Sequence, residues 1–231
     1  MIVRVAHGVA GAISFRESHG PIVVIDALRM SATVIVALGL GMEVIPVATV
    51  EEAMAVKDKG GCTAGERGGK RLSELDLGNS PTELLALERS SDDLTGKALA
   101  LTTSNGVPAL LAVADHSGAV LIGSSLNLSA LATRINDEAP RELSLLLAGV
   151  EEEKAAQEDA MTAALLLEHL DEPIPSALPS PTPVGDLETL FLRTPSGQKL
   201  VSLGYEEDVR LCARIDRYPV VPVFREGRVT V

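Results

Sequence analysis

The sequence of 231 residues has few aromatic side chains and few cysteines. Aromatic residues make up 2% of the chain and tryptophan is absent, although 46% of the residues are hydrophobic. Alanine, valine and leucine must therefore fill the interior, which suits helices packed on a buried parallel sheet. Cys62 and Cys212 form no CxxC pair, so a disulfide framework and a zinc-binding spacing are both absent. This cysteine usage is typical of a reducing cytoplasm.

Basic residues and long apolar segments are also scarce. The chain has 20 Lys and Arg residues against 32 Asp and Glu residues, a formal net charge of −12. This charge opposes binding to nucleic acid or to an anionic membrane surface. No segment approaches the roughly 20 apolar residues of a membrane span, and the amino terminus lacks a signal-peptide run. We expect a cytoplasmic protein with a single domain over residues 1–231 and a small-molecule ligand.

Short apolar segments alternate with helix-like segments along most of the chain. Each expected strand is followed by a helical segment, and the strands are placed at residues 21–25, 44–47, 62–64, 98–102, 120–123 and 143–148. This alternation predicts an α/β protein with three α/β/α layers and a mainly parallel sheet. Capping patterns at Thr49 with Glu52, and at Ser80 with Glu83, mark two helix starts. A long polar loop is expected at 65–79.

The carboxyl-terminal quarter differs in character. Prolines at 173–183 predict a stiff surface connection rather than a domain boundary. Beyond them, residues 185–193 and 205–213 are expected to be helical. Residues 218–224 and 228–231 flank a Glu-Gly turn and are expected to form a closing hairpin.

Polar residues gather in the loops that follow the predicted strands. In a parallel α/β sheet the ligand crevice lies beyond the carboxyl ends of the strands, next to helix N-termini. The candidate catalytic residues in these loops are Asp26, Arg29, Glu66 and Arg67. The candidate substrate-binding residues are Asn79, Ser104, Asn105, Gly106, Ser124 and Asn127. Together these groups suit a small polyanion.

Carboxylates in the same loops suit a hard cation. Mg²⁺ takes a few carboxylate oxygens together with water and substrate phosphate. If the loops converge, the candidate metal ligands are Asp26, Asp76, Glu158 and Asp159. The guanidinium groups of Arg29 and Arg67 can clamp phosphate, and helix N-terminal amides after Asn105 and Asn127 can hold a further anionic group.

Each of these residues also has a purely structural interpretation. Asp26 can cap the helix that follows it, and Glu66 with Arg67 can be a surface ion pair. Taken alone, Glu158 and Asp159 are more often a pair of acids at a helix N-terminus than metal ligands. Several sharper motifs are missing, including a Walker A loop, a GxSxG elbow and a second Asp two residues after Asp26. Nucleotide binding and several other phosphatase mechanisms are therefore disfavoured.

The same residues occur in the order and spacing of a known family. The segments are VVIDALRMSATVIVAL, AGERGGKRLSELDLGNSPTE, LTTSNG, IGSSLN, the EDA at Glu158 and SLGYEEDVRLCARID. Over nearly the whole chain the sequence resembles the 2-phosphosulfolactate phosphatase family. The resemblance implies a three-layer α/β fold of its own type and Mg²⁺-dependent hydrolysis of a phosphate ester. Its matching positions, without assigned roles, are Asp26, Arg29, Glu66, Arg67, Asp76, Asn79, Asn105, Asn127, Glu158 and Asp159.

Two departures from the family pattern concern the substrate. Val107-Pro108 stands where a Thr-Arg-like pair is expected, and residues 196–199, SGQK, stand where a basic segment follows His-Gly in the family. Two possible anion-binding groups are therefore missing. This leaves open whether the substrate carries a sulfonate.

The sequence thus predicts an Mg²⁺-dependent phosphatase for a small phosphorylated organic acid, 2-phosphosulfolactate or a related compound. The attacking group is either water or Asp26 itself, through a phospho-aspartate. The alternative is a non-catalytic anion- or metabolite-binding homologue, and a phosphotransferase has no particular support. A homodimer is expected.

Overall fold

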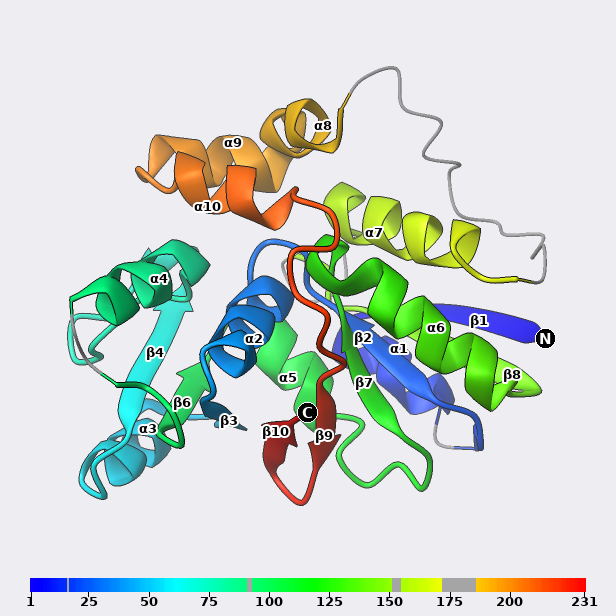
Figure 1. Cartoon of the computed structure of the whole chain (residues 1–231), viewed down its shortest axis with the longest axis horizontal. Helices are drawn as coiled ribbons and strands as arrows, with labels where there is room; N and C mark the ends of the chain where they lie inside the picture. Colours follow the sequence, from blue (N-terminus) through cyan, green and yellow to red (C-terminus); the bar gives the residue numbers. More distant parts are fainter. Residues whose placement is uncertain (16, 91–92, 151–154, 172–185) are drawn as a thin grey trace.

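The computed structural model describes residues 1–15, 17–90, 93–150, 155–171 and 186–231, and in these residues one sheet lies between helices (Figure 1). Its strands are β1 (Ile2–His7), β2 (Ile22–Ile25), β3 (Glu43–Pro46), β4 (Cys62–Arg67), β5 (Lys70–Arg71), β6 (Ala98–Thr102), β7 (Val120–Gly123), β8 (Glu142–Leu147), β9 (Val223–Arg225) and β10 (Arg228–Thr230). The helices are α1 (Gly8–Ala12), α2 (Met30–Gly39), α3 (Val50–Lys57), α4 (Pro81–Arg89), α5 (Gly106–Leu111), α6 (Leu128–Glu138), α7 (Gln157–Glu168), α8 (Leu187–Arg193), α9 (Pro195–Ser202) and α10 (Glu206–Cys212), with 3₁₀ turns η1 (Ile13–Phe15) and η2 (Ser125–Asn127).

The strand order is β1-β8-β2-β7-β9-β10-β3-β6-β4-β5, and it contains two groups of parallel strands. β1, β8, β2 and β7 form the first group, and β3, β6 and β4 form the second. The carboxyl-terminal hairpin β9-β10 lies between the groups, antiparallel to β7 on one side and to β3 on the other. The expected hairpin is confirmed, and it lies inside the sheet rather than at its edge.

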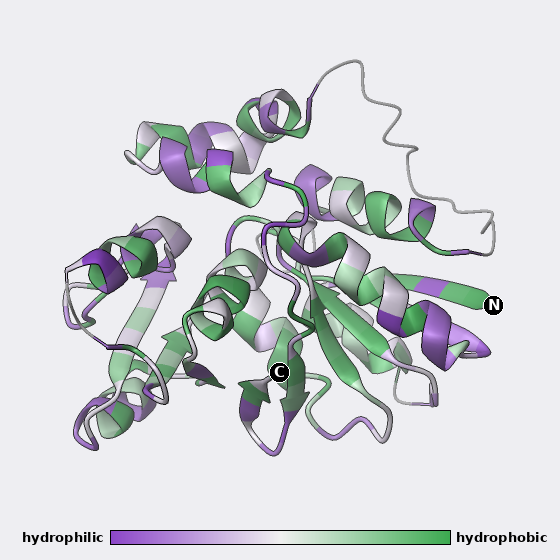
Figure 2. Ribbon diagram, in the orientation of Figure 1, coloured by the Kyte–Doolittle hydropathy of each residue, from purple (hydrophilic) through white to green (hydrophobic). Residues whose placement is uncertain are grey.

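Alternate residues of β2 show why the fold has three layers. Ile22 and Val24 belong to the core beneath α2 and α5, whereas Val23 and Ile25 belong to the core beneath α6 and α7. Successive side chains of a strand point to opposite faces, so a strand without polar residues needs helices on both sides. Figure 2 shows the central strands as hydrophobic and the covering helices as mixed. The three-layer α/β/α fold with a mainly parallel sheet is therefore confirmed.

The polar segment expected as a loop at 65–79 contains regular structure. β4 continues to Arg67 and turns back into β5, with Glu66 opposite Arg71 and Arg67 opposite Lys70. The turn uses Gly68 and Gly69 at φ of +61° and +88°, a conformation that favours glycine. This hairpin was not predicted from the sequence because its strands carry charged rather than alternating apolar residues.

Two further regions differ from the expectation. The amino-terminal strand β1 was not predicted, and it pairs in parallel with β8 along its whole length. The helix α9 was not expected, although Thr194 caps it by accepting the Gly197 N–H at 3.0 Å and Pro195 occupies its first position. The proline-rich segment at 173–183 lies outside the described residues.

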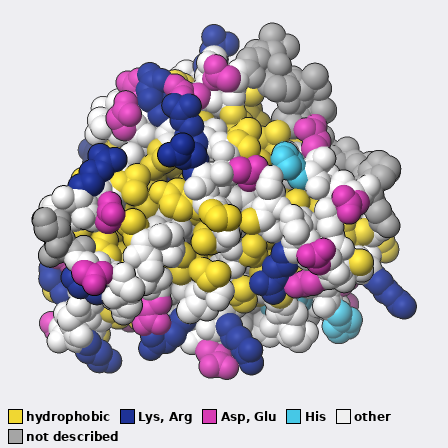
Figure 3. Space-filling view, in the orientation of Figure 1, with side chains coloured by type: hydrophobic (Ala, Val, Ile, Leu, Met, Phe, Trp, Pro, Cys, Tyr) yellow, Lys and Arg dark blue, Asp and Glu magenta, His cyan; other side chains and the backbone are white. Residues whose placement is uncertain are grey.

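The three carboxyl-terminal helices α8, α9 and α10 lie together beyond the end of the sheet toward which β4 points (Figure 1). Arg210 of α10 pairs with Glu188 of α8 and with Glu206 one turn away. On the face shown in Figure 3, basic side chains in this region stand beside acidic ones. In the part of the chain that the structure describes, no helix has the length and apolar character to cross a membrane.

Candidate active site

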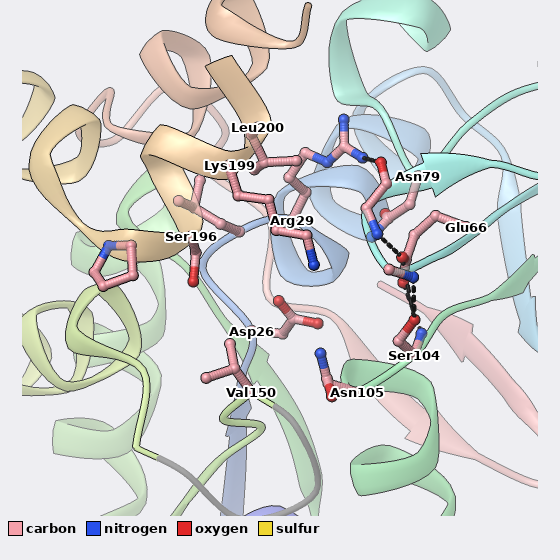
Figure 4. A pocket seen from close by; sticks show the side chains of 14 residues that line it. Asp26, Arg29, Glu66, Asn79, Ser104, Asn105, Val150, Ser196, Lys199 and Leu200 are labelled. Carbon is pink, nitrogen blue, oxygen red and sulfur yellow. Dashed lines mark hydrogen bonds between the residues drawn. The ribbon is translucent and has the colours of Figure 1, made fainter. Parts of the chain in front are cut away.

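A cavity of about 370 Å³ opens where the carboxyl ends of β2, β4 and β6 meet (Figure 4). Residues from both parallel groups and from the carboxyl-terminal helices form its wall. Six of the residues predicted from the sequence line it, namely Asp26, Arg29, Glu66, Asn79, Ser104 and Asn105. The loops therefore converge as the fold class implied.

Asp26 follows β2 directly, lines the cavity and has 8% of its surface exposed. Its backbone is fixed by Ser31, whose hydroxyl accepts the Asp26 N–H at 2.9 Å and whose own N–H bonds to the Asp26 carbonyl. The carboxylate accepts the Met30 N–H at the start of α2. Gly106 lies against the carboxylate, since a Cβ there would be 2.2 Å from Asp26 Oδ2. Asp26 thus bonds to a helix N-terminus, as a capping residue does, and also faces the cavity.

The electrostatic environment of Asp26 is unusual. The pKa of Asp26 is raised from 3.8 to about 7, first by burial and then by the carboxylates of Glu66 and Glu158. The Met30 N–H and the Arg29 charge lower this pKa, but by less. Burial likewise raises the pKa of Asp159 well above 3.8, with added contributions from Asp26 and Glu158. Four acidic side chains therefore meet in a poorly solvated region, which favours binding of a proton or a cation.

Arg29, predicted to clamp phosphate, lines the cavity and is also bound within the protein. Its guanidinium is 1% exposed, forms an ion pair with Asp208 of α10 and donates to the Gly69 carbonyl at 3.0 Å. The ring of Tyr205 lies 4.2 Å from the guanidinium carbon. Asp208 also accepts hydrogen bonds from Ser80 and Thr82 at the start of α4. Much of the donor capacity and charge of Arg29 is therefore already used within the protein.

Glu66 joins the β4-β5 turn to the loop after β6. Its carboxylate accepts the Ser104 N–H at 2.6 Å, the Ser104 hydroxyl at 3.2 Å and the Gly69 N–H at 2.5 Å. The Ser104 hydroxyl also accepts the Gly68 N–H at 3.0 Å. Glu66 thus holds two walls of the cavity together while its own oxygens stay hydrogen-bonded.

Arg67 lies outside the cavity wall and is exposed. It donates to the Glu66 carbonyl at 2.7 Å and to the Thr102 hydroxyl at 3.0 Å. Neighbouring residues of a strand point to opposite faces, and on β4 it is Glu66 that lines the cavity while Arg67 does not. The structure therefore separates these two predicted catalytic residues.

Asp76 is also separated from the other predicted metal ligands. Its carboxylate pairs with Lys57 of α3 and accepts the Thr63 N–H at 3.1 Å and the Thr63 hydroxyl at 2.8 Å. Thr63 lies three residues before Glu66 on β4, away from the carboxyl end of the strand. Asp76 fixes the chain beside β4 and does not line the cavity.

Ser124 and Asn127 form a reciprocal cap after β7. Asn127 Oδ1 accepts the Ser124 N–H at 3.0 Å, and its Nδ2 donates to the carbonyls of Ile122 at 3.3 Å and Val220 at 3.0 Å. Both side chains are buried and do not line the cavity. Their bonds connect the end of β7 to the segment that leads into β9.

Glu158 and Asp159 occupy the first turn of α7 and are each 2% exposed. Asp159 accepts the Ala27 N–H at 2.8 Å and the Gly149 N–H at 3.0 Å, so it joins the loops after β2 and β8. Glu158 Oε2 is buried and has no hydrogen-bond partner among the described residues. An unsatisfied buried carboxylate oxygen requires an explanation, because its desolvation is costly.

The donor set fits one mode of Mg²⁺ binding. Within the described ranges, no group of three or more His, Cys, Asp or Glu side chains is arranged to hold a metal ion. Buried oxygens without a described partner do occur at Glu158 Oε2 and at Asn79 Oδ1, which lines the cavity. Mg²⁺ usually takes one or two carboxylates together with water and substrate phosphate. The site suits this shared binding and does not suit a cage made only of protein ligands.

Several residues of the site were not predicted from the sequence. Lys199 and Ser196 of α9 line the cavity, although residues 196–199 were interpreted as a segment that had lost its basic groups. Asp208 and Tyr205 were missed as well, because Glu206-Glu207-Asp208 has the pattern of solvated acids at a helix N-terminus. Their roles depend on how the carboxyl-terminal helices pack over the sheet, which local sequence does not reveal.

Comparison with known proteins gives consistent matches along the chain. A family model described as 2-phosphosulpholactate phosphatase matches residues 11–227. A 2-phosphosulfolactate phosphatase of Methanothermobacter thermautotrophicus is 37% identical over 221 residues, which cover 92% of this chain and 90% of the relative. A probable 2-phosphosulfolactate phosphatase of Thermus thermophilus is 33% identical, with 90% of this chain and 89% of the relative covered. One of Thermotoga petrophila is 30% identical, with 89% of each chain covered.

Proposed function

The chain belongs to the 2-phosphosulfolactate phosphatase family, and we propose that it hydrolyses the phosphate ester of a small organic acid with the help of Mg²⁺. The substrate is 2-phosphosulfolactate or a related phospho-acid. The observation that carries the proposal is Asp26, a buried carboxylate with a raised pKa that faces a cavity of about 370 Å³. A cavity of this size matches a small ligand, and pockets of this kind commonly hold catalytic groups with perturbed pKa values.

Asp26 and Glu158 are the residues that would hold Mg²⁺, with the Asn79 side-chain oxygen as a further donor. Asp26 faces the cavity, and the like charge of Glu158 raises the pKa of Asp26. Glu158 Oε2 is buried and has no hydrogen-bond partner among the described residues. When bound, Mg²⁺ would offset the charge of the phosphoryl group and make phosphorus more open to attack. Asp159 supports this arrangement by fixing the loops that carry Asp26 and Val150.

Asp26 is the group in the cavity suited to activate a water molecule. A base must be ionised at the operating pH. Without a metal ion the pKa of Asp26 is about 7, and Mg²⁺ beside the carboxylate would lower this pKa, so that Asp26 would be ionised and able to accept a proton at neutral pH. The water oxygen bonds to phosphorus, its proton passes to Asp26, and the bond from phosphorus to the ester oxygen breaks. The departing alcohol oxygen then takes the proton from Asp26. The products are the hydroxy acid and inorganic phosphate.

The polar groups around Asp26 can position the substrate. Asn105 points toward Asp26 from the loop after β6, and Asn79 and Ser104 lie on the same side of the cavity (Figure 4). The Glu66 hydrogen bonds hold Ser104 and Gly69 in place before the substrate arrives. Such preorganised donors stabilise developing charge without reorganisation.

The test compares phosphate release by the wild type, Asp26→Asn and Asp137→Asn, an exposed acid on α6. Asp26→Asn should lower the turnover number by at least ~100-fold, the contribution typical of a general base. Asp137→Asn should match the wild type, and all three proteins should give the same circular dichroism spectrum. Full turnover by Asp26→Asn would remove Asp26 from the mechanism. A protein that binds the ester without releasing phosphate would instead be the non-catalytic homologue.

A phosphate ester made chiral at phosphorus with oxygen isotopes identifies the attacking group. If water attacks phosphorus directly, the single displacement inverts the configuration at phosphorus. If Asp26 attacks, a phospho-aspartate forms and water displaces Asp26 in a second step, so the two inversions retain the configuration. The proposed base role predicts inversion.

A further inference from the structure

The cationic groups near the cavity are distributed unevenly. Arg29 lines the cavity but is paired with the buried Asp208, and Arg67 lies outside the wall. Within the described part of the chain, the Lys199 ammonium forms no ion pair, and Lys199 lines the cavity from α9. Lys199 is thus the cavity cation whose charge the described residues leave unbalanced.

The stem of Lys199 is placed by contact between α9 and the β4-β5 turn. A Cβ built on Gly69 would lie 3.9 Å from Lys199 Cε, 3.6 Å from Leu200 Cδ2 and 3.2 Å from Leu203 Cδ1. Leu200 is 5% exposed, so α9 is anchored in the core at the next residue. Figure 4 shows the Lys199 side chain extending from this helix toward Asp26.

Ser196 adds a hydroxyl group to the same wall. Residues three apart on a helix lie on one face, and both Ser196 and Lys199 line the cavity. The opposite wall carries the carboxylates of Asp26 and Glu66, which repel an anionic group that has no metal ion beside it. The cavity is therefore electrically asymmetric, with negative charge at the strand ends and positive charge on α9.

We propose that Lys199 and Ser196 of α9 form a subsite for the acid group of the substrate, a carboxylate or sulfonate, while the phosphate lies at Asp26. This inference rests on the proposed function. An ammonium on a long stem can follow either acid group, because it needs no fixed planar partner. The subsite makes the protein selective for phosphate esters that carry a second anionic group.

Three phosphate esters test the subsite. Phospholactate carries a carboxylate, the phosphate ester of 2-hydroxyethanesulfonate carries a sulfonate, and ethyl phosphate carries neither. Lys199→Met should raise KM about 10- to 100-fold for the substrate whose acid group it binds, the loss expected for one charge-assisted hydrogen bond. Its kcat should change little, and kcat/KM for ethyl phosphate should stay within about twofold of the wild type. An effect on only one of the two acids identifies the acid group that is bound.

Controls separate charge from structure. Lys199→Arg should retain most of the affinity, and Ser196→Ala should show a smaller rise in KM than Lys199→Met. Lys59→Met should behave as the wild type because Lys59 is exposed on another surface. Thermal unfolding of Lys199→Met should match that of the wild type. Equal losses on all three esters would show that Lys199 binds the phosphate instead, and no loss on either acid would also overturn the subsite.

Calorimetric titration with ligands that carry no phosphate measures binding at the subsite without any catalytic step. Lactate and 2-hydroxyethanesulfonate are titrated into the wild type and Lys199→Met, and weaker binding of at least one of them by the variant supports the subsite. Equal binding of both ligands by the two proteins would contradict it. Absence of phosphate release from every ester by the wild type would contradict the proposed function and leave this titration to decide the subsite.

Discussion

Arg29 and Asp208 form a buried ion pair that connects the start of α2 to α10, with side chains 1% and 0% exposed. Asp208 also accepts hydrogen bonds from Ser80 and from the hydroxyl and N–H of Thr82. Arg29 in turn bonds to the Gly69 carbonyl in the β4-β5 turn. The pair therefore joins four segments that surround the cavity, and much of the charge of each member is balanced within the protein.

Removing one member of this pair should be costly. Asp208→Asn leaves the buried Arg29 charge uncompensated, and such losses destabilise proteins by about 3–5 kcal/mol. Urea unfolding of the variant measures this cost. The double variant Arg29→Met with Asp208→Leu should recover part of the stability, since it removes both charges. A single-variant loss below about 1 kcal/mol would show that the pair is not desolvated in solution.

Gly106 should be required for the position of Asp26. In Gly106→Ala the new methyl group would lie 2.2 Å from Asp26 Oδ2 and 2.6 Å from Met30 Cβ, so the carboxylate must move. We expect turnover to fall by at least ~100-fold, because misplacement by about 1 Å has effects of this size. The matched control is Gly204→Ala, where a Cβ contacts nothing within 4 Å and only the backbone at φ of +87° is strained. Activity near that of the wild type in Gly106→Ala would contradict the close contact.

The raised pKa of Asp26 predicts how stability depends on pH. The carboxyl group loses its proton near pH 3.8 in the unfolded chain and near pH 7 in the folded one, so the folded state binds the proton more tightly. Protonated Asp26 therefore contributes about 4 kcal/mol to the free energy of unfolding at pH values below about 3.8. This contribution is lost as the pH rises toward 7. With chelator present, Asp26→Asn should therefore unfold at a higher temperature than the wild type above pH 7, and the gain should shrink toward about pH 5.

Asp76→Asn provides a control of opposite sign. Burial raises the pKa of Asp76, but hydrogen bonds from Lys57 and Thr63 outweigh this effect and lower it below 3.8. The ionised Asp76 carboxylate therefore stabilises the folded state at pH values above 3.8. This contribution to the free energy of unfolding is lost as the pH falls through the lowered pKa of Asp76. Asp76→Asn should thus lower the unfolding temperature at neutral pH. If both variants moved the unfolding temperature in the same direction, the assigned environments would be wrong.

Sequence patterns were most informative where local physics decides the structure. The capping box at Thr49 and Glu52 and the Ser80-Pro81 helix start are both present, and the strand Ala98–Thr102 has the predicted limits. These features depend on neighbouring residues alone. The strand ends also predicted that Asp26, Glu66 and Asn105 would meet, because parallel strands present their carboxyl ends at a common crevice.

The parts of the site that were not predicted depend on distant packing. The sequence predicts Glu66 and Arg67 together in one loop, whereas β4 continues through both residues and turns their side chains to opposite faces. Lys199 and Asp208 reach the cavity only because α9 and α10 pack over the β4-β5 turn and α4. A cytoplasmic location and a homodimer stay predictions from the sequence.

The most direct measurement is phosphate release from 2-phosphosulfolactate by the purified wild-type protein, first with chelator, then with Mg²⁺ restored in excess. We expect no turnover with chelator and full recovery with Mg²⁺, since Asp26 and Glu158 would leave the remaining coordination positions of the cation to substrate and water. Equal phosphate release in both conditions would contradict metal-assisted hydrolysis at this cavity, and no release in either would contradict the phosphatase activity itself.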